Sequence, residues 1–325
     1  MGERWVSVIP KCHGVSLDIV VDHKFKSANA LASQIPGCRG TEDLRSVLND
    51  KKIDAILIAT SHKYLSPVTH SALMAGKHVL CEKPGAIKSS DIKRNATLAK
   101  KKGLTYMIGY NHRFHDGFLK ARKLYDRGTI GKLIFIRARY GFGGRIGYET
   151  EWRLNKAVSG GGHLIDQGVH MIDLALSFIG KVKRVSGFTS DTFWKKGVED
   201  NAFVLIQDKG GAIASIHASL TQWKALHNFE IYGTKGYLSI EGLGTKYGES
   251  EKLVIGKRAD DFIGPVKEKI VKCNPLADDS LMLELKHFSD IIRGRKKNPL
   301  ISGAYISNAY EALKIVEKVY RDNKL

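Results

Sequence analysis

The stretch DAILIAT, residues 54–60, is a short apolar run of the kind that forms a buried strand, and three others resemble it. These are LDIVVD (17–22), HVLCE (78–82) and LTYMIGY (104–110). Helix-like patterns separate the runs, and strands that alternate with helices indicate a parallel sheet. Parallel strands are buried on both faces, which explains why the runs lack polar alternation. The first part of the chain therefore predicts an α/β fold with a doubly wound parallel sheet.

Beyond residue 131 the strand signals lie closer together and are joined by short turns such as Lys209–Gly211. This spacing indicates a second, mainly antiparallel sheet. The expected strands are residues 132–140, 182–190, 201–208, 212–220, 229–233 and 236–241.

The run 201–208 has large apolar residues on both faces, for example Phe203 on one and Val204 on the other. Both faces should therefore be covered. We expect the helix 163–179 to cover one face and a second copy of the chain the other, which predicts a homo-oligomer.

The length of 325 residues favours two domains, which we place at 1–112 and 113–325. The last helix, about 303–323, is expected to pack back on the first domain.

No apolar run approaches the ~20 residues of a membrane-spanning helix, and the first fifteen residues lack a signal peptide pattern. The four cysteines are scattered without a C-x-x-C pair, so we expect a reducing, cytoplasmic location and no cysteine zinc site.

The chain has 52 Lys and Arg against 33 Asp and Glu, a formal net charge of +19. Such an excess suits nucleic acid, anionic surfaces or phosphorylated substrates without choosing among them. The basic clusters 100–102, 195–196 and 293–297 lack interleaved aromatic residues, which favours solvated surface over nucleic-acid or membrane binding.

A doubly wound dinucleotide fold normally opens with a strand and a G-x-G-x-x-G turn. This chain instead begins Met1-Gly2 and runs straight into a helical pattern. If Gly2 is the last glycine of that fingerprint, the first strand is absent and the chain starts about ten residues late. A variant fold is the alternative.

Asp22 closes the run LDIVVD about twenty residues after Gly2, where a carboxylate can bind both ribose hydroxyls of NAD. His23 and Lys24 follow it and could instead receive the 2′-phosphate of NADP. The pattern favours NAD and leaves NADP open.

The segment GGGHLIDQGVH, residues 160–170, is a glycine-rich turn that enters a helix. Asp166 and His170 are four residues apart, so a helix places them on one face, where the carboxylate can orient the imidazole for acid–base chemistry. Metal ligation with His163 is disfavoured because no second set of ligands has a matching spacing. A purely structural role of both side chains is the remaining alternative.

Lys83 stands at the carboxyl end of the run HVLCE and precedes Pro84. Ligands bind outside the ends of parallel strands, and a lysine there can stabilise alkoxide charge. Proline biases Lys83 to an extended conformation and makes a cis bond accessible. A surface lysine is the alternative.

These motifs together resemble the Gfo/Idh/MocA oxidoreductases. The resemblance rests on Ala59-Thr60, residues 75–79, Glu82-Lys83-Pro84, residues 109–114, and Ser159–Gly162 followed by Asp166 and His170. It implies a Rossmann domain, a second α/β domain with a large open sheet, NAD or NADP as cofactor, and sugars, polyols or nucleotide-sugars as substrates.

By the same resemblance, His170 is the acid/base, Asp166 binds or orients the substrate hydroxyl, and Lys83 contacts the nicotinamide ribose and the reacting oxygen. Thr60, Ser61 and His62 stand where the family usually has Thr-Pro-Asn. The residues expected to bind the cofactor are Gly2, Asp22, Thr60, Ser61, His62, Glu82, Lys83, Asn111, Trp152 and Arg153. Those expected to bind the substrate are Lys83, Tyr110, Arg113, Asp166 and His170.

The sequence thus predicts an NAD(P)-dependent oxidoreductase that moves hydride to or from a secondary alcohol carbon of a sugar-like, anionic substrate. A sensor that binds the same ligands without catalysis is the first alternative. A basic nucleic-acid-binding protein is the second, although no helix-turn-helix, zinc or RNA-binding signature is present.

Overall fold

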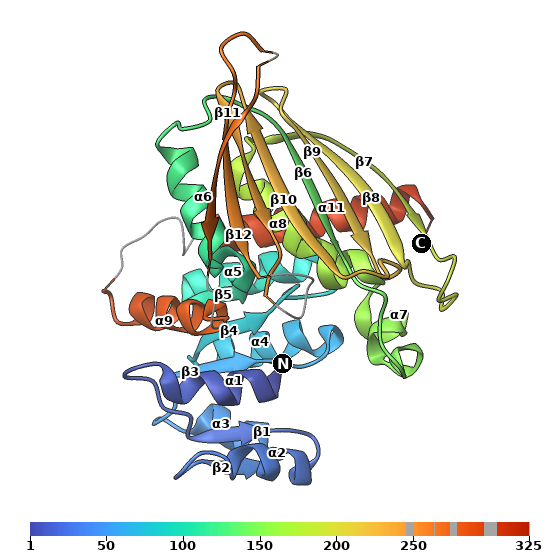
Figure 1. Ribbon diagram of the computed structural model, residues 1–325. Helices are drawn as coiled ribbons and strands as arrows, with labels where there is room; N and C mark the ends of the chain where they lie inside the picture. The colour runs from blue at the N-terminus through green and yellow to red at the C-terminus, as the bar shows by residue number, and fades with distance from the viewer. Residues whose placement is uncertain (245–249, 263, 274–277, 296–303, 325) are drawn as a thin grey trace. The chain divides into compact units, whose positions relative to one another are not determined.

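A computed structural model describes the chain except for residues 245–249, 263, 274–277, 296–303 and 325 (Figure 1). The chain divides into two compact units. The first unit comprises Met1–Gly109 and Leu281–Tyr310, and the second comprises Tyr110–Ser280 and Glu311–Leu325.

The first unit alternates strands and helices, as the apolar runs predicted. Its strands are β1 (Ile19–Val21), β2 (Arg39–Thr41), β3 (Ala55–Ile58), β4 (His78–Glu82) and β5 (Tyr106–Gly109). Its helices are α1 (Gly2–Val8), which the 3-10 turn η1 (Ile9–Lys11) extends, α2 (Phe25–Ala32), α3 (Leu44–Asn49), α4 (His62–Met74), α5 (Ser89–Lys101) and nearly all of α9 (Ser280–Ile292). The sequence did not predict β2, because Arg-Gly-Thr has no apolar side chain.

The parallel strands of the first unit form two separate groups. β1 pairs with β2, and β4 pairs with both β3 and β5. In the doubly wound order 3-2-1-4-5-6, these groups fill the positions on either side of the first strand, a position that none of the described residues occupies. β1 and most of β3 are half-buried, whereas β4 and β5 are almost wholly buried. β1 and β3 are the strands next to that position, and an edge without a neighbouring strand leaves a strand partly exposed.

The second unit is built on an eight-stranded sheet in the order β13-β12-β11-β10-β6-β9-β8-β7. Every pairing is antiparallel except that of β6 with β9. This confirms the expected large and mainly antiparallel sheet. The strands are β6 (Leu133–Gly141), β7 (Val182–Ser190), β8 (Asn201–Asp208), β9 (Ile213–Ser219), β10 (Leu226–Gly233), β11 (Gly236–Glu241), β12 (Lys252–Lys257) and β13 (Lys267–Lys272).

Helices cover one face of this sheet (Figure 1). They are α6 (Asp116–Asp126), α8 (Val169–Phe178) and the later part of α11 (Ala304–Asp322), the helix whose residues are shared between the two units. On β8 the side chains of Ala202, Val204 and Ile206 are buried, whereas Phe203 and Leu205 are 55% and 50% exposed. The helix-covered face is therefore the core of the second unit, and the opposite face of β8 is apolar and open in the single chain.

All four cysteines are free thiols, and burial raises the pKa of the Cys81 thiol to about 12. Within the described parts of the chain, no helix is both long and apolar enough to cross a membrane. The histidines, cysteines and carboxylates of the described ranges form no group of three or more that could hold a metal ion.

Candidate active site

Two of the expected loops lie at the carboxyl ends of neighbouring strands in the first unit. Lys83 directly follows β4, and its peptide bond to Pro84 is cis. Thr60 and Ser61 join β3 to α4, which begins at the buried His62. β3 and β4 are parallel neighbours, so both loops leave the same edge of the sheet, where doubly wound folds bind ligands.

Glu82, the last residue of β4, is buried and accepts a hydrogen bond of 2.8 Å from Trp5 Nε1. Burial raises the pKa of the Glu82 carboxyl, which the Trp5 bond opposes. This carboxyl group ties α1 to the end of β4, a structural role that its position in the motif Glu82-Lys83-Pro84 did not reveal.

Gly2 is the first residue of α1, and Asp22 directly follows β1. Asp22 accepts a hydrogen bond of 2.9 Å from the backbone N–H of Lys24, and its Oδ1 lies 3.1 Å from Nδ1 of His23. The Asp22 side chain is 38% exposed, so its carboxylate can accept further hydrogen bonds from a ligand.

The glycine turn in the second unit is fixed by Glu199. One oxygen of this buried carboxyl accepts the N–H of Gly162 at 2.8 Å, and the other accepts the N–H of Leu164 at 2.9 Å and the hydroxyl of Tyr320 at 2.6 Å. A Cβ at Gly162 would lie 2.0 Å from the Glu199 carbonyl oxygen, so only glycine allows this approach. Burial raises the pKa of Glu199, and the Tyr320 hydrogen bond counteracts that shift.

The segment after this turn differs from the α-helix that the sequence predicted. Residues Leu164–Gly168 form a π-helical turn, and α8 begins only at Val169. A π turn is wider than an α turn, so four residues of spacing no longer stack Asp166 directly below His170. Both side chains are nevertheless buried, with exposed fractions of 3% each. Such turns occur frequently at functional sites.

Asp166 lies beside a cation. Its Oδ2 is 3.3 Å from Nε of Arg153, and Nη1 of Arg153 also binds Glu151 at 2.9 Å. The Arg153 guanidinium sits 4.8 Å from the Trp152 ring centroid. Of the two residues of the 3-10 turn Trp152–Leu154 expected to bind cofactor, Arg153 therefore contacts the Asp166 carboxylate, and Trp152 lies beside the Arg153 guanidinium.

His170 is packed among rings from the 109–114 motif. His112 stacks on it with 3.9 Å between ring centroids, and Tyr110 contacts it edge-on at 5.7 Å. The Tyr110 hydroxyl is buried and has no hydrogen-bond partner among the described residues. Burial raises the pKa of Tyr110 well above its usual range, so this hydroxyl stays protonated and can donate to a ligand. His112 lies within the 109–114 motif, but no role was predicted for it.

Arg113 forms a two-pronged ion pair with the buried Asp173 of α8, at 2.5 and 2.6 Å. Burial raises the pKa of Asp173, and the guanidinium lowers it. We expected Arg113 to offer its fork to the substrate, but the structure uses two of its donors inside the protein. They fix the turn η2 (Asn111–Phe114) against α8.

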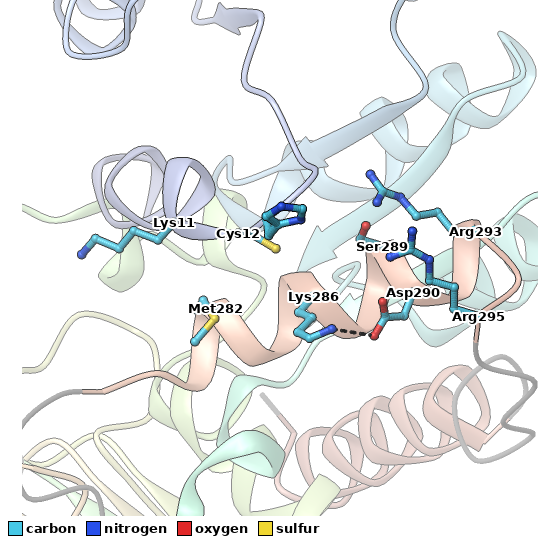
Figure 2. A pocket seen from close by; sticks show the side chains of 9 residues that line it. Lys11, Cys12, Met282, Lys286, Ser289, Asp290, Arg293 and Arg295 are labelled. Atoms are coloured by element: carbon cyan, nitrogen blue, oxygen red, sulfur yellow. Dashed lines mark hydrogen bonds and ion pairs between the residues drawn. The ribbon is translucent and has the colours of Figure 1, made fainter.

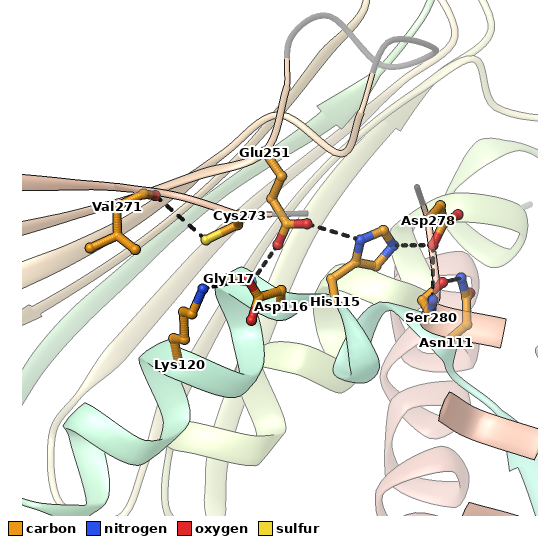
Figure 3. A network of polar contacts seen from close by, with 10 residues as sticks. All are labelled: Asn111, His115, Asp116, Gly117, Lys120, Glu251, Val271, Cys273, Asp278 and Ser280. Carbon is orange, nitrogen blue, oxygen red and sulfur yellow. Dashed lines mark hydrogen bonds and ion pairs between the residues drawn. The ribbon is translucent and has the colours of Figure 1, made fainter. Parts of the chain in front are cut away.

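A polar network contacts the residues at the start of η2 and those just after it (Figure 3). Glu251 accepts the Gly117 N–H at 2.6 Å, and its second oxygen lies 3.3 Å from Nδ1 of His115. Asn111 donates to the Ser280 hydroxyl at 2.9 Å. The positions of Asn111, His112 and Arg113 are thus set by contacts on both sides of the turn.

The fold and these residues define a class, the nicotinamide-dependent oxidoreductases with a Rossmann domain and a second domain built on an open sheet. Family models match both parts of the chain: "Oxidoreductase family, NAD-binding Rossmann fold" over residues 2–110 and "GFO/IDH/MocA C-terminal domain" over residues 118–239. The chain belongs to the Gfo/Idh/MocA oxidoreductase family, and its first unit is an NAD-binding Rossmann domain.

Several characterised proteins are similar to it. Mouse trans-1,2-dihydrobenzene-1,2-diol dehydrogenase is 29% identical over 269 residues, which cover 82% of this chain and 77% of that enzyme. Levoglucosan dehydrogenase of Pseudarthrobacter phenanthrenivorans is 26% identical over 223 residues, or 60% of this chain and 57% of that one. A solved structure of a levoglucosan dehydrogenase with NADH and levoglucosan superposes with a TM-score of 0.85 over 99% of this chain and 95% of the other, at 21% identity.

The residues of the first unit fit the cofactor that this family implies. Asp22 presents a part-exposed carboxylate at the end of β1, where a ribose diol binds in such folds. Gly2 is the first residue of α1, and Lys83 directly follows β4. In the second unit, the buried Tyr110 hydroxyl lacks a partner among the described residues, as expected of a group that a ligand satisfies.

Proposed function

We propose that this protein is an NAD-dependent dehydrogenase or reductase that interconverts a secondary alcohol and a ketone on a sugar, polyol or nucleotide-sugar. The observation that supports it most is the buried imidazole of His170, held among aromatic rings and preceded on the same helical segment by the carboxylate of Asp166. An imidazole is suited to general acid–base catalysis because its unperturbed pKa lies near neutral pH.

In the oxidative direction, an imidazole nitrogen of His170 takes the hydroxyl proton while the C–H bond releases its electron pair as hydride. NAD, when bound, supplies the hydride acceptor. Asp166 orients the hydroxyl, and Arg153, whose Nε lies 3.3 Å from Oδ2 of Asp166, holds that carboxylate in place. Lys83 stabilises the developing alkoxide. In the reductive direction the same groups return the proton.

The remaining expected residues keep their proposed roles. For the cofactor these are Gly2, Asp22, Thr60, Ser61, His62, Glu82, Asn111, Trp152 and Arg153. For the substrate they are Tyr110 and Arg113 beside the three catalytic residues. Asp22 favours NAD, whereas His23 leaves NADP open as a second cofactor.

The sugar class of substrate is supported by relatives that carry the names levoglucosan dehydrogenase and 1,5-anhydro-D-fructose reductase. The formal net charge of +19 supports an anionic member of that class, such as a nucleotide-sugar. A cytoplasmic location agrees with the four free thiols.

A homo-oligomer through the sheet is supported by the apolar side chains on its uncovered face. Phe188 and Phe203 are paired across β7 and β8, and they are 76% and 55% exposed. Leu205 and Ile213 extend this patch, with exposed fractions of 50% and 43%. An apolar face of this kind is typical of a surface that a partner covers.

The test is an NADH titration of the chain, followed by energy transfer from its four tryptophans, and then a turnover screen over sugars and nucleotide-sugars. His170→Ala should lower turnover about 10²–10⁴-fold and leave NADH affinity unchanged. His70→Ala, at an imidazole that faces Asn95, is the control for loss of a histidine. Saturable NADH binding without turnover of any substrate class would favour the sensor, and full activity of His170→Ala would remove His170 from the mechanism.

A further inference from the structure

A pocket of about 210 Å³ lies in the first unit between the end of α1 with its extension η1 and the second half of α9 (Figure 2). The proposed function uses none of the residues that line it. The charged groups among them are four permanent cations, one histidine and a single carboxylate: Lys11, Lys286, Arg293, Arg295, His13 and Asp290.

The cations from α9 are held in place by the protein itself. Lys286 Nζ lies 3.2 Å from the buried Asp290 carboxylate, which is the only anionic side chain that lines the pocket. Arg293 donates from Nη2 to the carbonyl of Gly14. The φ of Gly14 is +77°, a backbone conformation that favours glycine and that turns this carbonyl towards the guanidinium.

This pocket is distinct from the edge that binds the dinucleotide. That edge includes Gly2, the first residue of α1, whereas the pocket begins at Lys11, the last residue of η1. Gly2 and Lys11 stand at opposite ends of the ten residues that α1 and η1 span, a length of about 15 Å. A ligand in the pocket would therefore not occupy the position of the cofactor pyrophosphate.

We propose that this pocket binds a small phosphate-bearing anion. Guanidinium and ammonium groups together suit phosphate oxygens, because the fork of arginine gives directed bonds and lysine gives a point charge. The volume is below that of pockets for drug-sized ligands, so it suits one or two phosphoryl groups with a small carbon skeleton. The single carboxylate is already paired with Lys286, which leaves the field of the other cations uncancelled.

Binding would join two segments that are far apart in the chain. Lys11 and His13 precede β1, whereas Arg293 and Arg295 follow α9. A phosphate bridging them would stabilise the folded first unit by an amount that rises with the logarithm of ligand concentration above Kd, as for any ligand of the native state. The site thus lets the enzyme bind a phosphorylated metabolite that does not compete with the cofactor for its binding site.

The experiment uses the full chain and inorganic pyrophosphate as the probe, at constant ionic strength, with calorimetric titration and thermal unfolding. The test variant is Arg293→Gln/Arg295→Gln. The control is Lys100→Gln/Lys101→Gln, which also removes two cations near a helix C-terminus of the same unit. We expect saturable binding that raises Tm, a Kd weakened at least about tenfold in the test variant, and a Kd within about twofold of wild type in the control.

Three results would overturn the proposal. One is the absence of saturable binding to the wild-type chain, and another is an equal loss of affinity in both variants, which indicates general charge attraction. The third is competition of pyrophosphate with NADH together with full affinity in the arginine variant, which places the anion in the dinucleotide site.

Far-UV circular dichroism and the ligand-free Tm establish whether each variant is folded. If the double variant does not fold, Arg295→Gln alone replaces it, because the contact with the Gly14 carbonyl comes from Arg293 and is kept.

Discussion

The imidazole of His112 lies parallel to that of His170, with 3.9 Å between the ring centroids and 12° between the planes. His112 comes from η2 and His170 from α8, and the Arg113–Asp173 ion pair joins the same two elements. The ring of the proposed base is therefore fixed by a stack and by an ion pair one turn away. Its orientation thus depends on His112 and Asp173, to which the proposed mechanism assigns no contact with the substrate.

Replacing His112 tests whether the stack positions His170. His112→Ala opens space beside the imidazole, and a displacement of about 1 Å can cost up to about 10²-fold in rate. We expect kcat to fall about 10–100-fold with little change in the KM of the substrate. His112→Phe keeps a flat ring in the stack and should retain most of the activity. Equal kcat values for wild type and His112→Ala would show that the stack is only packing.

The hydroxyl of Tyr320 is expected to matter for stability and for catalysis, because it binds the carboxyl group that fixes the glycine turn. Tyr320→Phe should lower the free energy of unfolding by about 1.5–3 kcal/mol, the range for hydrogen bonds to charged groups. Urea unfolding measures this value, and kcat should fall as well because the turn leads to Asp166.

Tyr125→Phe is the matched control for Tyr320→Phe. It removes a part-buried hydrogen bond of 3.1 Å to the neutral Phe178 carbonyl and should cost about 0.5–1.5 kcal/mol without loss of kcat. If the two variants behave alike in both stability and kcat, Glu199 and Tyr320 have no special role at the turn.

The sequence predicted the strands whose burial gives a strong local signal. HVLCE became β4 over the same residues, and NAFVLIQD became β8 over the same residues. β2, β12 and β13 were missed. Arg-Gly-Thr and Lys-Glu-Lys-Ile-Val-Lys have little or no continuous apolar character, and the apolar run of β12 is only the three residues Leu-Val-Ile. These strands form because a neighbouring strand supplies their hydrogen bonds, which is information outside the segment itself.

The motifs of the site were visible in the sequence, but the hydrogen bonds and ion pairs that hold these motifs in place were not. Glu199 binds Gly162 over 37 residues and Tyr320 over 121 residues, so no local spacing could reveal the anchor. The π turn Leu164–Gly168 was missed because the apolar pattern of the segment fits an α-helix equally well. The ion pair of Arg113 with Asp173 joins residues 60 positions apart, so local spacing could not reveal it either.

The apolar face of the sheet predicts an oligomer that a single charge should disrupt. Phe203→Asp would place a carboxylate in the middle of the buried surface, where an unpaired charge is strongly unfavourable. We expect light scattering after size exclusion to show dimers or larger species for wild type and monomers for Phe203→Asp. Tyr64→Asp, at a side chain 52% exposed in the first unit, should leave the wild-type mass unchanged. A monomeric wild-type chain at micromolar concentration would contradict the predicted interface.

His227 should make the second unit sensitive to acid. Its ring is buried between Tyr140 and Phe118, neither nitrogen has a hydrogen-bond partner among the described residues, and burial lowers its pKa from 6.5 to about 3. The unfolded chain thus binds a proton that the folded chain does not, so stability is lost as pH falls from about 6.5 towards 3.

His227→Phe should remove this loss, because phenylalanine fills similar space without titrating. Between pH 6.5 and pH 4.5 wild type should lose about 2–3 kcal/mol more than the variant in urea unfolding. His23→Phe, at a side chain 82% exposed, should follow wild type, and an unchanged pH slope in His227→Phe would mean that another group causes the acid sensitivity.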